Sequence, residues 1–188
     1  MWERFAALRN ARPGGFDVIA LMRPPDAAYD EDVGRWLERA RAAQRGGPFG
    51  LHTHWTSPSH ARPTDGDPAQ RVHAEAEWMR AQGLDPRFFC GGGWYTNDAV
   101  RMEVRSLGLV DCTDREGAPA AGVLPTTHSL GQLARAQLRP LPGYVHAYFH
   151  DYDLLDPVRR SVLAASMRLL ARRRRQIDPL AASAELAP

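Results

Sequence analysis

Short apolar runs alternate along the chain with segments whose apolar residues recur every three or four positions. The runs predict buried strands and the periodic segments predict amphipathic helices, and their alternation is typical of βα units around a mostly parallel sheet. The expected strands are 16–22, 48–51, 87–90, 109–112 and 144–149, with a further short strand at 123–124. The pattern therefore predicts an α/β fold.

The expected helices begin at residues that can accept a hydrogen bond from the first helical turn, and several of them end near glycine. The expected cap residues are Asp30, Asp67, Thr96 and Asp156. Asp67 is the clearest, because a proline follows it at the first helical position. The last helix carries an apolar face made of Val158, Val162, Ala165 and Leu169.

Length and composition point to one folded domain. The chain has 188 residues, and 44% of them are hydrophobic, which is enough to bury a core. No repeat of 20–50 residues is visible. We expect an N-terminal helical segment at 1–15, an α/β domain at 16–178 and a flexible tail at 179–188.

Charge and residue usage exclude several classes of function. The 24 basic and 22 acidic residues give a net charge of +2, so no nucleic-acid partner is expected. All basic residues are arginine, which excludes chemistry that needs a lysine. The chain has neither a long apolar run nor a secretory signal, so no membrane partner is expected and the predicted location is cytoplasmic. Cys90 and Cys112 cannot build a disulfide framework.

His52 and His54 follow an apolar run that predicts a strand. Side chains two residues apart on a strand point to the same side, so both imidazoles can reach one point. Imidazole nitrogens bind zinc and similar ions, which makes the pair a candidate metal site. The alternative is two polar side chains in a loop, hydrogen-bonded to the backbone.

A second group of rings lies on the last predicted strand, where His146, Tyr148 and His150 share one side. In an α/β sheet the carboxyl ends of strands form the ligand crevice, and His150 and Asp151 fall at that end. A histidine beside a carboxylate can act as a general acid. The alternative is a histidine held by Asp151 or Asp153 with no substrate nearby.

Three glycines followed by Trp94 and Tyr95 come directly after the predicted strand at 87–90. Glycines allow close backbone approach, and the two aromatic rings offer flat faces to a sugar or an apolar ring. The segment matches neither a dinucleotide fingerprint nor a phosphate-binding loop. The alternative is that the glycines only turn the chain.

Three stretches, GPFGLHTHW, FFCGGGWYTND and VHAYFHDYDL, together resemble the polysaccharide deacetylases (NodB homology, carbohydrate esterase family 4). The similarity extends over roughly residues 16–175. It implies a distorted, incomplete (β/α) barrel that removes N- or O-acetyl groups from glycans. In that family one aspartate and two histidines hold a divalent metal, a further aspartate activates the metal-bound water, and a late histidine protonates the leaving group.

The resemblance assigns roles to particular residues of this chain. His52 corresponds to the first metal histidine and His150 to the late acid. The second metal histidine is His54, or His60 if the following loop folds back. The groove that binds substrate would include Gly92, Gly93, Trp94, Tyr95 and Asp151. The implied cofactor is a divalent metal ion, zinc first, with cobalt, nickel or iron as alternatives, and the implied partner is a carbohydrate or a small acylated substrate.

The chain also departs from the family pattern. Thr56 occupies the usual position of the second histidine, Cys90 replaces the groove arginine, and the Thr-Phe-Asp-Asp motif expected before Phe16 is absent. Either the true start lies upstream or the protein has lost the base and the carboxylate ligand, and the histidines that persist favour the first. Two other functions therefore stay open: a non-catalytic glycan-binding or regulatory module, and a hydrolase of small amides.

Overall fold

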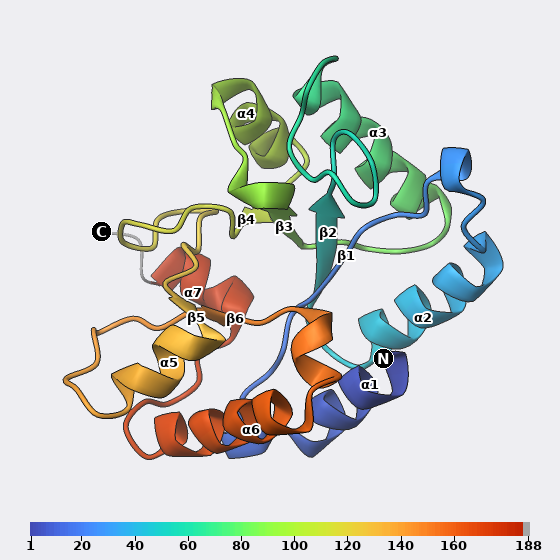
Figure 1. The fold of residues 1–188 in the computed structure, drawn as a ribbon. Coiled ribbons are helices and arrows are strands. Elements are labelled where there is room, and N and C mark those ends of the chain that lie inside the picture. The colour runs from blue at the N-terminus through green and yellow to red at the C-terminus, as the bar shows by residue number, and fades with distance from the viewer. Residues whose placement is uncertain (186–188) are drawn as a thin grey trace. The chain divides into compact units, whose positions relative to one another are not determined.

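The computed structural model describes residues 1–185, which divide into two compact units. Unit 1 contains residues 1–18 and 126–178, and unit 2 contains residues 19–125 together with the segment that starts at Pro179. Figure 1 follows the chain through both units. Unit 1 is therefore assembled from two stretches that lie far apart in the sequence.

Unit 2 contains, within the described residues, a four-stranded parallel sheet in the sequential order β1-β2-β3-β4. The strands are β1 (Ala20–Met22), β2 (Phe49–Thr53), β3 (Phe88–Gly91) and β4 (Val110–Asp111). The connecting helices are α2 (Val33–Arg45), α3 (Pro68–Ala81) and α4 (Asp98–Ser106). This arrangement confirms the predicted α/β class. Strands β1 and β4 lie inside the predicted ranges 16–22 and 109–112, whereas β2 and β3 end later than the predicted ranges 48–51 and 87–90.

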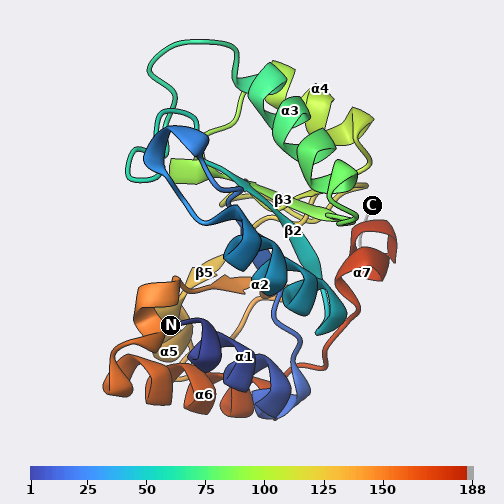
Figure 2. The same cartoon turned by 90° about the vertical axis from the view of Figure 1, so that its right-hand side faces the viewer.

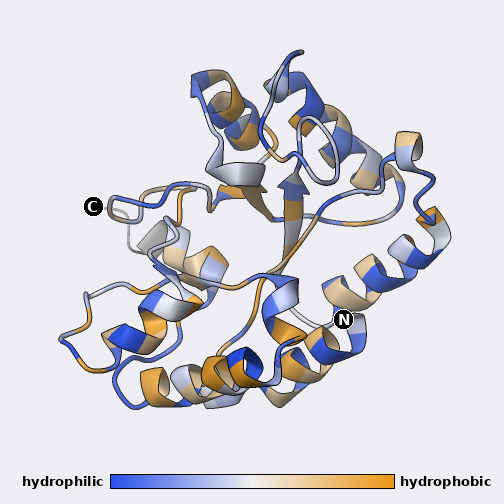
Figure 3. Cartoon of the chain, in the orientation of Figure 1, coloured by the Kyte–Doolittle hydropathy of each residue, from blue (hydrophilic) through white to orange (hydrophobic). Residues whose placement is uncertain are grey.

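The core of unit 2 lies between the sheet and its helices. Both faces of β3 are buried, and its four residues are all shielded from solvent, as is usual for parallel strands covered by crossover helices. Figures 1 and 2 show α3 and α4 side by side, and Figure 3 shows hydrophobic residues along β3. The largest fully buried side chains here include Leu51, Val72, Met79, Phe88, Phe89, Val100 and Val104.

The type of residue that caps α2, α3 and α4 was predicted correctly, but the position of the cap was not always right. Asp67 caps α3 as expected and accepts hydrogen bonds from the N–H groups of Ala69 and Gln70. Two predicted caps are wrong: Asp32 rather than Asp30 caps α2, and Asn97 rather than Thr96 caps α4. In both cases the sequence offers two residues of good capping type close together, and the structure uses the later one.

Unit 1 contains α1 (Trp2–Ala11), the 3₁₀ turn η1 (Pro13–Gly15), α5 (Leu130–Ala136), the 3₁₀ turn η4 (Asp151–Leu154) and α6 (Pro157–Ala171). Strands β5 (His128–Ser129) and β6 (Ala147–Tyr148) pair in parallel. The predicted strand 144–149 is thus much shorter than expected. The predicted helical segment at 1–15 is α1 with η1, and it shares a core whose buried members are Leu8, Leu130, Leu154, Leu163 and Met167.

Apolar residues lie on two sides of helix α6. The side that is buried in the structure is not the one that the sequence predicted. Leu163, Met167 and Leu170 are buried, whereas Val158 is 71% exposed. Val162 and Leu169 are also exposed. The larger leucine and methionine side chains fill the core, so the regular valine spacing indicated the helix but not its buried face.

The remaining elements are short. In unit 2 these are the 3₁₀ turns η2 (Ala27–Tyr29) and η3 (Gly92–Trp94), and helix α7 (Pro179–Glu185). The predicted tail at 179–188 therefore begins with a helix, and residues 186–188 lie outside the described residues. Among the residues that the structure describes, no helix combines the length and the apolar character needed to span a membrane.

Candidate functional site

His52 and His54 point their Nε2 atoms at one another at the carboxyl end of β2. The two Nε2 atoms are 3.2 Å apart. The Nδ1 atom of His52 lies 2.8 Å from the carbonyl oxygen of Cys90, and Nδ1 of His54 lies 2.8 Å from that of Pro58. The structure therefore brings together the pair that the sequence predicted, and it fixes which nitrogen of each ring faces the other.

These contacts decide the tautomer of each ring. A carbonyl oxygen can only accept a hydrogen bond, so both Nδ1 atoms must carry a proton. A neutral imidazole protonated at Nδ1 has a lone pair at Nε2. Two lone pairs 3.2 Å apart repel unless a cation lies between them. The geometry therefore suits either a shared proton or a shared metal ion.

The surroundings of His54 disfavour a shared proton. Burial lowers the pKa of His54, and the positive charges of Arg23 and Arg71 lower it further, against the raising effect of backbone hydrogen bonds. A protonated pair is therefore disfavoured. Two nitrogens bound at about 2.05 Å to a tetrahedral zinc ion lie about 3.3 Å apart. The separation of the two Nε2 atoms fits that arrangement.

The pair supplies two ligands, and a third protein ligand is not in place. Among residues 1–185 no group of three or more histidine, cysteine, aspartate or glutamate side chains is arranged to hold a metal ion. His60, the alternative second ligand, has its Nδ1 atom 3.1 Å from Ser57 Oγ and 3.0 Å from Ser59 Oγ. The residues present thus fit half of a tetrahedral centre.

Gly92 packs directly against the ring of His54 and the backbone of Thr53. A Cβ atom at this position would lie 2.6 Å from the carbonyl oxygen of Thr53 and 2.8 Å from His54 Cδ2. Gly93 has a positive φ of 60°, and its carbonyl oxygen accepts a hydrogen bond from Arg62 Nε. Close packing accounts for glycine at both positions, and their predicted contact with substrate stays a prediction.

The two aromatic residues after the glycines have different surroundings. Trp94 is in the left-handed region with φ 57°, which is unusual for a bulky residue, and the Arg115 guanidinium lies 4.9 Å from its ring centre. Tyr95 packs edge-on against the buried Trp55 at 5.0 Å between ring centres. Both are half-buried, and their predicted role in holding substrate stays a prediction.

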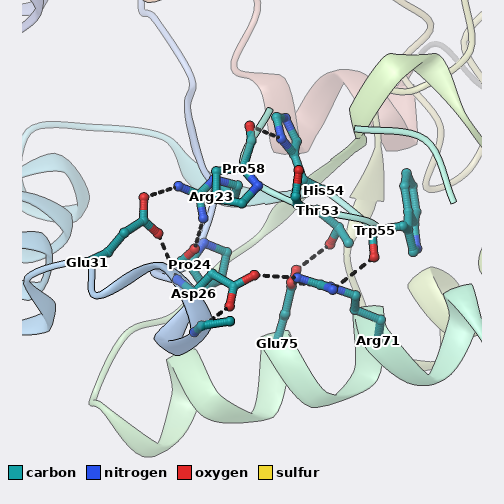
Figure 4. Close-up of polar contacts among 12 residues, drawn as sticks. Arg23, Pro24, Asp26, Glu31, Thr53, His54, Trp55, Pro58, Arg71 and Glu75 are labelled. Atoms are coloured by element: carbon teal, nitrogen blue, oxygen red, sulfur yellow. Dashed lines mark hydrogen bonds and ion pairs between the residues drawn. The ribbon is translucent and has the colours of Figure 1, made fainter. Parts of the chain in front are cut away.

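A polar network around the residues that flank His54 was not predicted from the sequence (Figure 4). Thr53 Oγ1 donates to Glu75 Oε2 at 2.7 Å, and Arg71 Nε donates to Glu75 Oε1 at 3.0 Å. Burial raises the pKa of Glu75, opposed by these hydrogen bonds from Thr53 and Arg71. The spacing of Arg71 and Glu75 on one helix indicates an i,i+4 ion pair, but nothing in the sequence links that pair to Thr53.

His150 and Asp151 lie in unit 1, at the start of η4. His150 is exposed, and its Nδ1 atom lies 3.0 Å from the Tyr152 hydroxyl, with the two rings stacked at 4.8 Å. Asp153 accepts a hydrogen bond from the backbone N–H of His150 rather than from its ring. Asp151 is exposed. The Tyr148 ring, predicted on the same side as His150, lies edge-on to it at 5.5 Å between ring centres, whereas the contact of Nδ1 with the Tyr152 phenol was not predicted.

Comparisons of the chain with family models, with characterised proteins and with solved structures each find no match.

Proposed function

We propose that the protein is a metal-dependent hydrolase that removes acetyl groups from carbohydrate, built on a distorted, incomplete (β/α) barrel of the polysaccharide deacetylase type. The observation that carries this proposal is the convergence of two Nε2 lone pairs from rings whose Nδ1 atoms both face carbonyl oxygens. The sequential order of parallel strands in unit 2 is the order that such a barrel requires. The resemblance of the three sequence motifs supplies the substrate class.

In this function His52 and His54 would hold a divalent ion, zinc first, through Nε2. A bound ion of this kind polarises an acyl carbonyl and lowers the pKa of a coordinated water toward about 7. The carbonyls of Cys90 and Pro58 fix the two rings in the ligating tautomer before any ion arrives. With two protein ligands, further positions are left for water and substrate.

Metal binding at the pair is the first test. After purification, zinc or cobalt content per chain should approach one in the unaltered protein and fall to background in the variant with both His52→Ala and His54→Ala. His60→Ala is the matched control, because His60 contacts Ser57 and Ser59 instead, and it should keep the metal. Equal metal content in the unaltered protein and the double variant would rule out this site.

The general acid is tested separately. If His150 protonates the leaving group, His150→Ala should lower kcat for deacetylation of chito-oligosaccharides about 100- to 10,000-fold without changing metal content. Tyr152→Phe, which removes only the hydroxyl beside Nδ1, is the matched control and should retain most of the activity. Unchanged kcat in His150→Ala would remove His150 from the reaction.

A second candidate function is a non-catalytic glycan-binding or regulatory module of the same fold. The absence of a three-ligand group among residues 1–185 favours it. This module would bind saccharides equally well before and after chelation of metal and would hydrolyse no acetyl ester or amide. Isothermal titration with chito-oligosaccharides, with and without chelator, separates the two functions.

A further inference from the structure

We propose that Glu75 and Arg71 of α3 are positioning residues that hold the histidine pair in its ligating geometry by fixing the backbone on both sides of His54. The inference deepens the proposed function, because it concerns the same site. Its structural content, the tautomer and aim of the two rings, can be measured without metal. The two proposals can therefore fail independently.

The first connection runs through Thr53, which stands between the two histidines. Side chains alternate along a strand, so Thr53 leaves β2 on the side opposite to His52 and His54. Its side chain is fully buried, and Oγ1 donates to Glu75 Oε2 at 2.7 Å. The Glu75 carboxylate on α3 thus fixes the position of Thr53, the residue between the two histidines.

The second connection runs through the carbonyl oxygen of Trp55, which follows His54. Arg71 Nη1 donates to this oxygen at 2.9 Å, and Arg71 Nε donates to Glu75 Oε1 at 3.0 Å. Figure 4 shows the guanidinium between these two partners, one turn of α3 from Glu75. The backbone before and after His54 is therefore tied to the same two side chains.

A third contact fixes the guanidinium from the other side. Arg71 Nη2 lies 3.6 Å from Asp26 Oδ2, and Asp26 belongs to the segment after β1. The side chains of Asp26 and Glu75 are mostly shielded from solvent, at 19% and 14% exposed. The Arg71 guanidinium thus links the segment after β1, the end of β2 and α3.

Stability alone gives a weak reason for this network. Desolvating two carboxylates and a guanidinium costs free energy that their attraction only partly returns, and an apolar replacement is often as stable. An apolar replacement would not fix the orientation of Thr53 and of the Trp55 carbonyl, as these hydrogen bonds do. Removing a group that hydrogen-bonds a metal ligand typically changes metal affinity about 10- to 100-fold. Glu75 and Arg71 reach the two histidines through Thr53 and the Trp55 carbonyl.

The test measures the rings directly. Two-bond ¹⁵N–¹H spectra of the metal-free protein at about pH 8 should show both His52 and His54 protonated at Nδ1. In Thr53→Val the Nδ1-protonated form should fall in at least one ring, and cobalt affinity should drop about 10- to 100-fold. Thr53→Ser keeps the hydroxyl and should restore both readouts.

Two further variants keep the inference open to refutation. Glu75→Gln leaves one acceptor oxygen in place of two, so the side chain can no longer accept from both Thr53 and Arg71. It serves if Thr53→Val does not fold, and it should show the same changes. Glu77→Gln is the matched control, because Glu77 lies on the same helix, is 52% exposed and pairs with Arg80. Unchanged tautomers and cobalt affinity within twofold in folded Thr53→Val and Glu75→Gln would overturn the proposal. If the unaltered protein binds no cobalt, the metal function fails, and the tautomer readout alone decides the role of α3.

Discussion

At the scale of single residues, Asp111 shows how burial makes a charge sensitive to pH. It lies at the end of β4 and is 4% exposed. Burial raises its pKa, with a further rise from Asp114, while hydrogen bonding with Thr113 and the charge of Arg101 act in the opposite direction. Because the folded-state pKa lies above the unfolded value, the contribution of Asp111 to stability is complete below the unfolded pKa and is lost as pH rises through the folded pKa.

Asp111→Asn should therefore change the pH dependence of stability. The amide oxygen can still accept the backbone N–H of Thr113, which Oδ1 accepts at 2.8 Å, but it no longer ionises. Relative to the unaltered protein, the free energy of unfolding of the variant should rise as the pH increases above about 4, the usual range in which an unfolded aspartate ionises. Urea denaturation at several pH values measures this difference, and a difference independent of pH would contradict the assignment.

The histidine pair also shows what a sequence can and cannot predict at this scale. The spacing of His52 and His54 was enough to predict that the two rings converge. Their tautomers were not predictable, because they depend on the carbonyl oxygens of Cys90 and Pro58, and every residue has a carbonyl. Backbone partners of this kind leave no signal in the sequence.

At the scale of elements, the tight contact between η3 and the end of β2 makes a clear prediction. Gly92→Ala places a Cβ against backbone oxygen and the His54 ring, neither of which can move easily. We expect a loss of about 1–3 kcal/mol in the free energy of unfolding, as for other overpacked sites. Chemical denaturation followed by tryptophan fluorescence measures it.

Gly34→Ala is the control for that experiment. Gly34 lies in the first turn of α2, also in unit 2, and a Cβ there would meet nothing closer than 3.4 Å. Alanine in a helix is favoured over glycine by about 1 kcal/mol. The control variant should be at least as stable as the unaltered protein, and a loss in Gly92→Ala no larger than in Gly34→Ala would refute the packing argument.

Helix α6 and the caps show the limits of prediction for elements. The apolar period predicted that α6 is a helix, but Leu163 and Met167 rather than Val158 face the core. A helix with two apolar sides can bury either, and the choice depends on the volume that α1 and α5 leave to be filled. Asp30 and Asp32 are equally good caps by type, so only the backbone path decides between them.

At the scale of the whole molecule, the alternation of strands and helices predicted the α/β class but not the grouping of segments. Residues 1–18 pack with 126–178 in unit 1, as in the hydrogen bond from Arg4 to the carbonyl of Leu155. Such contacts join positions 151 residues apart. Periodicity is a local property of the sequence, so it predicts which elements form and says nothing about which distant elements meet.

The pairing of β2 with β3 has a consequence for folding. His52 faces Cys90 in the strand register, and the carbonyl of that same Cys90 receives the His52 ring. A slip by one residue would turn the side chains of β2 to the opposite face, with Thr53 on the side of the site and both imidazoles beneath α3. If the proposed ion binds the two rings, it would bind best where the Cys90 carbonyl holds the His52 ring, so by mass action it would stabilise this alignment relative to misaligned, partly folded chains. The same two histidines would then favour the correct register of β2 against β3 as the protein folds.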